Sequence, residues 1–192
     1  LNWLALDYAN FREFKIAPKP DLIVFNSESY LDFFKKYNLP SLNGFAFKQK
    51  YIKDFRETKL EKSGKTLLVL FSGNNAEVNW QLDMLQQISK DFRIMVRKHP
   101  LYAFDLDDIW SSEEYEVVTD QMFKEVLFQK PKVLSTYSSL ALECASMGMS
   151  VGLVYNKKRL IFNPFDFTKV VNHSIISNKD DLIRFLQQEE QD

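Results

Sequence analysis

The sequence predicts an α/β fold, in which a doubly wound parallel sheet carries helices on both faces. From residue 65 onward, short apolar runs rich in β-branched and aromatic residues alternate with stretches of helical period. Capping and stop residues separate the two kinds of segment. The chain has 192 residues, of which 45% are hydrophobic, and this is enough to cover both faces of such a sheet.

The first 60 residues are expected to be the tail of a preceding domain together with the crossover that leaves it. They contain two apolar runs of strand length, at 21–25 and 42–47. Between these runs, Ser27 is expected to cap a helix. Residues 48–64 are highly charged and hold little apolar material, so they form either a crossing helix or a linker.

Residues 61–192 are expected to form one domain with five parallel strands. The strands are the apolar runs at 65–71, 92–97, 115–119, 132–136 and 151–155. Four helices have capping candidates, namely Asn74, Asp120, Ser138 or Ser139, and Asn178. Ligands of doubly wound sheets bind beyond the carboxyl ends of the strands. The loops after the first, second and fourth strands are therefore the candidate site.

Composition excludes several classes of function. Lys and Arg number 25 against 26 Asp and Glu, so the net charge of −1 argues against nucleic-acid binding driven by bulk charge. A lone Cys144 excludes an intramolecular disulfide framework, and the two histidines lie far apart in the sequence, so no metal site is expected. No apolar run reaches the ~20 residues that span a bilayer.

The first candidate loop, residues 72–75, leads from a strand into a helix. Gly73 lets a ligand approach the backbone, and a helix that begins at Asn74 offers its positive end to an anion. Glu77, three residues after Asn74, fits a capping box. The loop lacks both the GxGxxG fingerprint and a Walker lysine, so a plain strand–helix turn and a phosphate contact are equally compatible with it.

The second candidate loop begins with Arg97, Lys98 and His99 at a strand end, where Pro100 fixes the backbone. Because neighbouring residues of a strand face opposite ways, Arg97 and His99 are expected on one side of the sheet. An imidazole there can donate to a phosphate oxygen or act as an acid. The alternative is a polar strand end with a surface histidine.

The third candidate loop offers several hydroxyl groups at the start of a helix. Either Ser138 or Ser139 caps that helix, and the same hydroxyls, with Thr136 and the free backbone N–H groups, can hold a phosphate. Glu143 lies one turn into the helix, where its carboxylate can accept hydrogen bonds from ribose hydroxyls. Cys144 is interpreted as a buried small hydrophobe and not as a nucleophile.

The segment 139–151 resembles the nucleotide-sugar segment of GT-B glycosyltransferases, in which a glutamate is followed five residues later by a glycine. Here these are Glu143 and Gly148. The resemblance implies that residues 61–192 are the Rossmann-like second domain of such an enzyme. It also implies that Glu143 holds the ribose of the donor.

The two remaining motifs narrow this resemblance. An R-x-H-P strand end followed by a turn such as 135–139 resembles the CDP-glycerol glycerophosphotransferases and the bacterial HP-motif sialyltransferases and polysialyltransferases. The resemblance implies that His99, Ser138 and Ser139 contact the phosphate of a CMP- or CDP-activated donor, with His99 as the catalytic residue. Arg97, Thr136, Gly73 and Asn74 are expected to complete the phosphate site.

These features predict a metal-independent, cofactor-free transferase that uses a nucleotide-activated sugar or polyol (CMP or CDP, with UDP open). It would act on a saccharide or lipid-linked acceptor in capsule or lipopolysaccharide synthesis, in the cytoplasm or peripherally at the inner face of the membrane. Since the chain begins at Leu1, we expect a missing N-terminal domain, and whether this chain is active alone stays open. The alternatives are a nucleotide-sugar epimerase of GT-B fold and a non-enzymatic interaction module.

Overall fold

The computed structural model describes residues 22–25, 40–43, 51–57, 65–72, 74–86, 92–99, 114–136, 138–155 and 173–188. The chain divides into two compact units, Leu1–Tyr51 and Ile52–Asp192. Each unit has one sheet among the described residues. That residues 1–60 are the tail of a preceding domain remains a prediction.

The first unit holds two short parallel strands, β1 (Ile23–Phe25) and β2 (Ser41–Asn43), with Val24 opposite Leu42. β1 lies within the predicted run 21–25, and β2 overlaps the start of the predicted run 42–47, of which residues 44–47 lie outside the described part of the chain. The helix expected after Ser27 lies outside the described residues.

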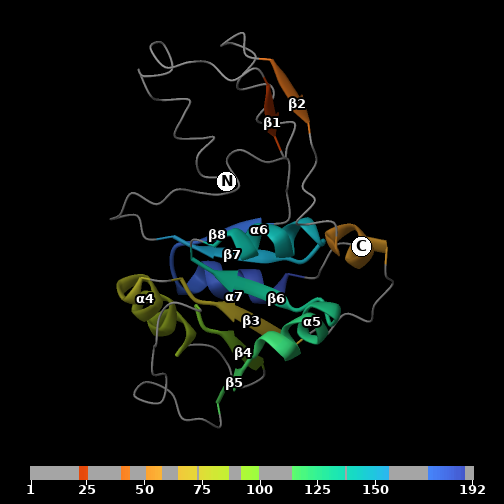
Figure 1. Ribbon diagram of the computed structural model, residues 1–192. Coiled ribbons are helices and arrows are strands. Elements are labelled where there is room, and N and C mark those ends of the chain that lie inside the picture. The colour runs from red at the N-terminus through yellow and green to blue at the C-terminus, as the bar shows by residue number, and fades with distance from the viewer. Residues whose placement is uncertain are drawn as a thin grey trace, which may run out of the picture. The chain divides into compact units, whose positions relative to one another are not determined.

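The second unit is built on a sheet of six parallel strands, which confirms the predicted α/β class (Figure 1). The strands are β3 (Thr66–Leu70), β4 (Arg93–Arg97), β5 (Glu116–Val117), β6 (Lys132–Ser135), β7 (Val151–Val154) and β8 (His173–Ile176). Their order is β5-β4-β3-β6-β7-β8. The five predicted strands are β3 to β7. We did not predict β8, an edge strand that begins with the polar pair His173 and Ser174 and leaves Ile175 exposed.

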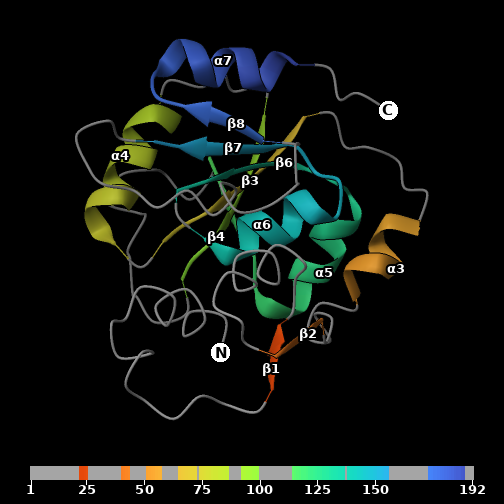
Figure 2. The same cartoon turned by 90° about the horizontal axis from the view of Figure 1, so that it is seen from above.

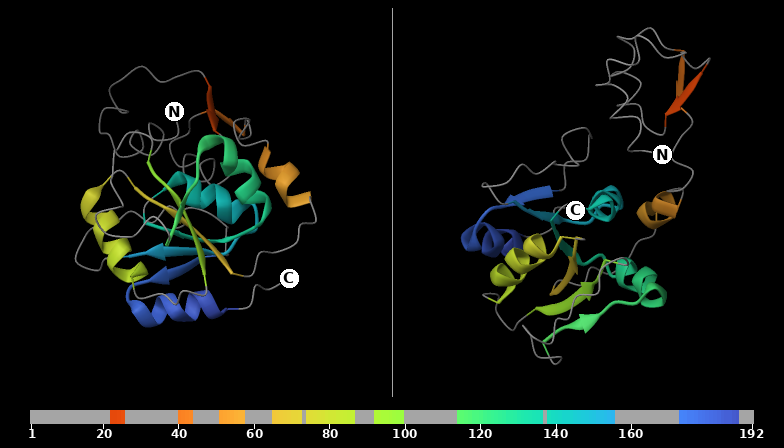
Figure 3. Two further views of the ribbon diagram at one scale, coloured as in Figure 1. Left: turned by 90° about the horizontal axis from the view of Figure 1, so that it is seen from below. Right: turned by 60° about the vertical axis from the view of Figure 1, so that its left-hand side comes forward.

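Helices cover both faces of this sheet, and each face has its own core. The helices are α3 (Tyr51–Glu57), α4 (Asn75–Leu85), α5 (Asp120–Phe128), α6 (Ser139–Ser146) and α7 (Lys179–Gln187). Buried residues of α4 and α7 pack on one face, and those of α3, α5 and α6 pack on the other (Figures 2 and 3). This arrangement follows from right-handed crossovers that run in opposite directions from the middle of the sheet.

The charged stretch 48–64, for which helix and linker were both open, contains the helix α3. The Phe55 ring of α3 stacks on Phe128 of α5, with ring centroids 4.3 Å apart. Phe55 is buried in the same core as α5 and α6, so α3 packs as part of the second unit.

Strand alternation distributes the central side chains between the two cores. On β3, Leu68 and Leu70 face the α5/α6 core, while Leu67 and Val69 face the α4/α7 core. All four are at most 2% exposed, as expected for a strand covered on both faces. At Gly152 of β7 an added Cβ would lie 3.1 Å from side chains of both Leu134 and Phe185, so the position has little room for a side chain.

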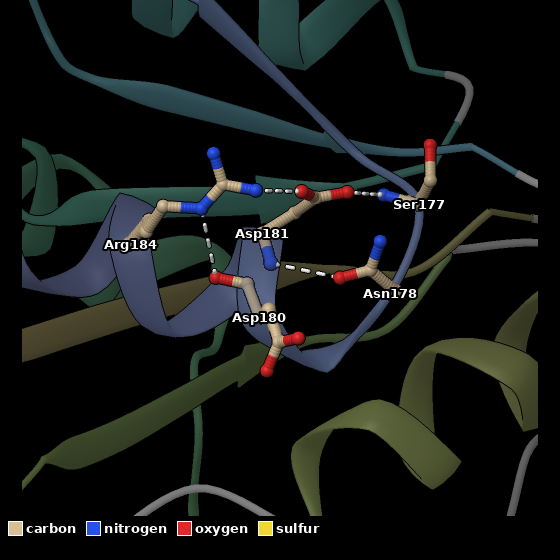
Figure 4. Close-up of polar contacts among 5 residues, drawn as sticks. All are labelled: Ser177, Asn178, Asp180, Asp181 and Arg184. Carbon is tan, nitrogen blue, oxygen red and sulfur yellow. Dashed lines mark hydrogen bonds and ion pairs between the residues drawn. The ribbon is translucent and has the colours of Figure 1, made fainter.

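Side chains cap the N-termini of α4, α5, α6 and α7, and α7 has the fullest cap (Figure 4). The Asn178 side chain accepts a hydrogen bond from the Asp181 N–H at 2.9 Å, and the Asp181 carboxylate accepts one from the Ser177 N–H at 2.9 Å. Arg184 pairs with the other oxygen of Asp181 at 2.6 Å. Two backbone donors at the helix start are thereby satisfied, as in a capping box, and Asn178 is the cap that the sequence predicted.

The cap of α5 differs from the prediction. Thr119, and not Asp120, is the N-cap, because its hydroxyl accepts a hydrogen bond from the Met122 N–H at 3.4 Å. Asp120 is the first helical residue, and its carboxylate pairs instead with Arg97. Threonine and aspartate are both good caps, so the sequence alone could not choose between adjacent candidates.

The end of α6 fits the expectation that Gly148 closes it. Gly148 has a φ of +91°, which a residue with a Cβ adopts only with strain. The Gly148 N–H donates to the Ala145 carbonyl and the Met149 N–H to the Cys144 carbonyl, at 3.0 and 3.1 Å. This pair of bonds is a Schellman motif, and it turns the chain directly into β7.

A buried lysine joins the central sheet to the last helix. Lys132, at the start of β6, is only 6% exposed. Its ammonium group donates to the carbonyls of Phe185, Leu186 and Gln188 at 3.0, 2.6 and 2.6 Å. These carbonyls lie at the end of α7, where a helix leaves carbonyls without helical partners and favours a cation.

We predict that Lys132→Met lowers the free energy of unfolding by about 3 kcal/mol, since it leaves buried carbonyls without their charged donor. Urea denaturation measures this loss. The matched control is Lys179→Met, an exposed lysine at the start of α7, which is expected to change stability by roughly 0.5 kcal/mol or less. Equal losses in both variants would contradict a special role for Lys132.

Candidate functional site

The strand order creates a switch point between β3 and β6, where the chain runs outward in opposite directions. Helix α4 leaves β3 on one face, and α6 leaves β6 on the other. The loops after two neighbouring strands therefore diverge at their carboxyl ends, which is the position where doubly wound sheets bind ligands.

Those predicted site residues that the structure describes lie at the carboxyl ends of β4, β3 and β6, or in α6, the helix that follows β6. These strands are neighbours, so the three ends span roughly 10 Å. Gly73, Pro100 and Tyr137 lie outside the described residues. By alternation with Met95, Arg97 faces the α5/α6 side, whereas Thr136 follows the last residue of β6 and leads toward α6.

The start of α4 is already supplied with a carboxylate. The Asn74 side chain accepts a hydrogen bond from the Ala76 N–H at 3.0 Å, so Asn74 caps the helix as predicted. The carboxylate of Glu77 accepts a hydrogen bond from the Ser72 hydroxyl at 2.8 Å, and the Asn74 N–H donates to that same hydroxyl at 3.3 Å. Glu77 thus offsets the positive end of α4, which makes this terminus less suited to a phosphate than the start of α6.

The start of α6, unlike that of α4, has no carboxylate to offset its positive end. Ser138 is the N-cap, and its hydroxyl accepts a hydrogen bond from the Leu140 N–H at 3.2 Å. Ser139 is exposed on the first turn, which contains no acidic residue. The positive end of α6 therefore remains available to an anion.

Thr136 stands between β6 and α6 and is 4% exposed. Within the described part of the chain, its buried hydroxyl has no hydrogen-bond partner. Leaving such a group unsatisfied costs about 1–3 kcal/mol, and buried hydroxyls in folded proteins normally find a partner. A hydrogen-bonding ligand or a water molecule at this position would remove that penalty.

Gln81 is a polar residue of this region that the sequence reasoning missed. It occupies an inward position of α4 among Val78, Leu82 and Leu85, and it is fully buried. Its side-chain amide donates to the Leu134 carbonyl of β6 at 3.2 Å, while its own oxygen has no partner within the described residues. The sequence does contain an indication of this role, because Gln81 interrupts a helical stripe whose other members are apolar.

Arg97 ends β4, and its guanidinium is held from two directions. One N–H donates to the Asp120 carboxylate at 2.8 Å, and the guanidinium carbon lies 4.2 Å from the centre of the Phe123 ring. The backbone carbonyl of Arg97 accepts a hydrogen bond from the Phe71 N–H at 3.1 Å, which ties the ends of β3 and β4 together. His99 follows two residues later and is half-buried.

Glu143 and Cys144 are neighbours on α6 with different surroundings. Glu143 is half-buried, whereas Cys144 is fully buried in the core. Burial, and secondarily the charge of Glu143, raises the pKa of the Cys144 thiol to about 12. The thiol therefore keeps its proton at neutral pH, in agreement with its interpretation as a small hydrophobe.

Two further observations concern the described residues only. No group of three or more His, Cys, Asp or Glu side chains among them is placed to hold a metal ion. None of the helices described has the length and apolar character needed to cross a bilayer.

No protein-family model and no curated protein matches the chain. Among solved structures, it is similar to a variant of the wall teichoic acid polymerase TagF soaked with CDPG, with a TM-score of 0.49 and 14% identity over 88% of this chain and 47% of that one. A second structure of the TagF variant gives a TM-score of 0.48 and 14% identity, over 88% of this chain and 48% of that one. The chain spans about half the length of these proteins. A likeness of this size says nothing about activity.

We predict that Ser138→Ala lowers the free energy of unfolding by about 1 kcal/mol, because it removes the cap of α6. Ser139→Ala, at the exposed next residue, is expected to change it by roughly 0.5 kcal/mol or less. Chemical denaturation of both variants separates the structural role of Ser138 from any role in binding. A larger loss for Ser139→Ala would contradict the assignment of the cap.

The raised pKa of Cys144 predicts a loss of stability at alkaline pH. Above its ordinary value of 9.0 the thiol ionises in the unfolded chain, while the pKa of about 12 keeps it protonated in the folded chain. Between pH 8 and pH 10 the unmodified chain should therefore lose about 1.4 kcal/mol more stability than Cys144→Ala. Urea denaturation at both pH values measures the difference, and parallel pH profiles would contradict it.

Proposed function

We propose that this chain is part of a GT-B-type transferase that binds a nucleotide-activated sugar or polyol, with a CMP or CDP donor. The observation that carries the proposal is the buried, unsatisfied hydroxyl of Thr136, two residues before the N-cap of α6, a helix with no acidic residue in its first turn. A phosphate oxygen accepts hydrogen bonds from such a hydroxyl and from the N–H groups of a helix start. The proposal therefore places the donor phosphate at the beginning of α6.

In the proposed transfer step, the protein acts by stabilising negative charge on the leaving phosphate and not by forming a covalent intermediate. When the bond between the donor phosphate and the transferred group breaks, negative charge develops on the leaving phosphate. The start of α6, the hydroxyls of Ser138 and Ser139, and the Arg97 guanidinium would stabilise this charge, and His99 would donate to the leaving oxygen. Glu143, half-buried one turn further, would accept hydrogen bonds from the ribose hydroxyls.

The first helix turn after β3 has a smaller part in this proposal. Because Ser72 and Glu77 already occupy the start of α4, the roles proposed for Asn74 and Gly73 reduce to close approach of the backbone to the ligand. The proposal assigns no acceptor site and no general base to the residues of the second unit. A saccharide or lipid-linked acceptor, and a general base for it, would be supplied with the preceding domain, at the inner face of the cytoplasmic membrane.

Calorimetry with CMP, CDP, UMP and UDP tests the proposal. We expect a cytidine nucleotide to bind, and Thr136→Val and His99→Ala each to weaken its binding about tenfold. The matched control is Thr66→Val, which alters a buried threonine at the amino end of the neighbouring strand β3 and should leave affinity unchanged.

No binding of any of the four nucleotides would overturn the proposal. Equal losses in Thr136→Val and Thr66→Val would overturn the placement of the phosphate at α6. Conversion of a UDP-sugar into a new sugar without any acceptor would identify an epimerase instead.

A further inference from the structure

Two arginines of the same strand are paired in contrasting ways. Arg93 begins β4 and pairs with Glu116, and Arg97 ends β4 and pairs with Asp120. The Arg93 side chain is 55% exposed, as is usual for a surface ion pair. The Arg97 side chain is only 22% exposed, although its partner Asp120 is 92% exposed.

The difference comes from what surrounds the Arg97 guanidinium. The Phe123 ring covers one face at 4.2 Å, and the Asp120 carboxylate takes one N–H at 2.8 Å. Both residues belong to the first turns of α5, so two contacts from one helix fix the plane of the guanidinium. A guanidinium has five N–H donors, and Asp120 is the one acidic partner that it has among the described residues.

Arg97 also lies at the end of the sheet where a ligand is expected. It closes β4, on the face of the sheet that carries α6, and β3 alone stands between β4 and β6. The Arg93 pair lies at the opposite, amino end of the same strand. An arginine held in one orientation loses less conformational entropy when it binds a phosphate than a freely rotating one.

We propose that Asp120 and Phe123 are positioning residues, which hold the Arg97 guanidinium as a fixed cation for the donor phosphate. The inference rests on the proposed function. Asp120 occupies one N–H and leaves the others for the ligand, so its carboxylate orients the arginine and does not block it. Neither residue is expected to touch the nucleotide.

A double-mutant cycle tests this with the affinity for CDP measured by calorimetry. Asp120→Asn keeps the size of the side chain and removes its charge, and it should weaken CDP binding roughly fivefold. Asp120→Glu should restore part of the affinity, and Phe123→Leu should reduce it. In a chain that already carries Arg97→Met, Asp120→Asn should have no further effect.

Glu116→Gln is the matched control, because it removes the ion pair at the other end of β4. Its affinity for CDP should equal that of the unmodified chain, while thermal unfolding reports whether the two single variants fold equally well. Unchanged or tighter binding by Asp120→Asn would overturn the inference, and so would an equal loss in the presence and absence of Arg97. If the unmodified chain binds no nucleotide, the proposed function fails first and this inference fails with it.

Discussion

The pairing of β3 with β6 joins the two halves of the six-stranded sheet, and both the core and the candidate site depend on it. The strands lie side by side from Leu67 opposite Lys132 to Leu70 opposite Ser135, and every residue of the pair is buried. More than 60 residues of chain separate them, so the free energy of this pairing must come from burial on both faces. Two side-chain bonds reinforce it at the carboxyl end, from Ser135 to the Leu70 carbonyl and from Gln81 to the Leu134 carbonyl.

The pairing of β3 with β6 also makes the two faces of the sheet differ at the candidate site. Because the chain leaves β3 and β6 on opposite faces, the starts of α4 and α6 lie on different sides of one sheet end. The carboxylate of Glu77 offsets the positive end of α4, whereas the first turn of α6 holds no acidic residue. An anion is therefore favoured on the α6 side, where Arg97 also lies. The net charge of −1 provides no long-range attraction, so the affinity for an anion must come from these few local donors.

Most of the second unit could be predicted from the sequence because its signals are local. The buried strands are continuous apolar runs, and Asn74, Ser138 and Asn178 all act as caps. What could not be predicted depends on contacts between distant residues. Asp120 offers its carboxylate to an arginine 23 residues earlier, so the cap passes to Thr119. Lys132 is buried only because α7, more than 50 residues later, presents its carbonyls to it. The roles of the site residues in binding stay predictions, since no ligand contact defines them.

Two buried polar residues lie at the two ends of β6, Lys132 as its first residue and Thr136 directly after its last, and their hydrogen bonding differs. At the amino end, the ammonium of Lys132 donates to three carbonyls at the end of α7, two in its last turn and one on the C-cap Gln188. At the carboxyl end, the hydroxyl of Thr136 has no partner within the described residues. Buried polar groups normally find partners, as the ammonium of Lys132 does, so the unsatisfied hydroxyl of Thr136 is an exception, as is the side-chain oxygen of Gln81. Departures from such rules concentrate where a protein binds or reacts. Thr136 departs from them at the end of the sheet where topology places a ligand, and this coincidence is the reason to test it first.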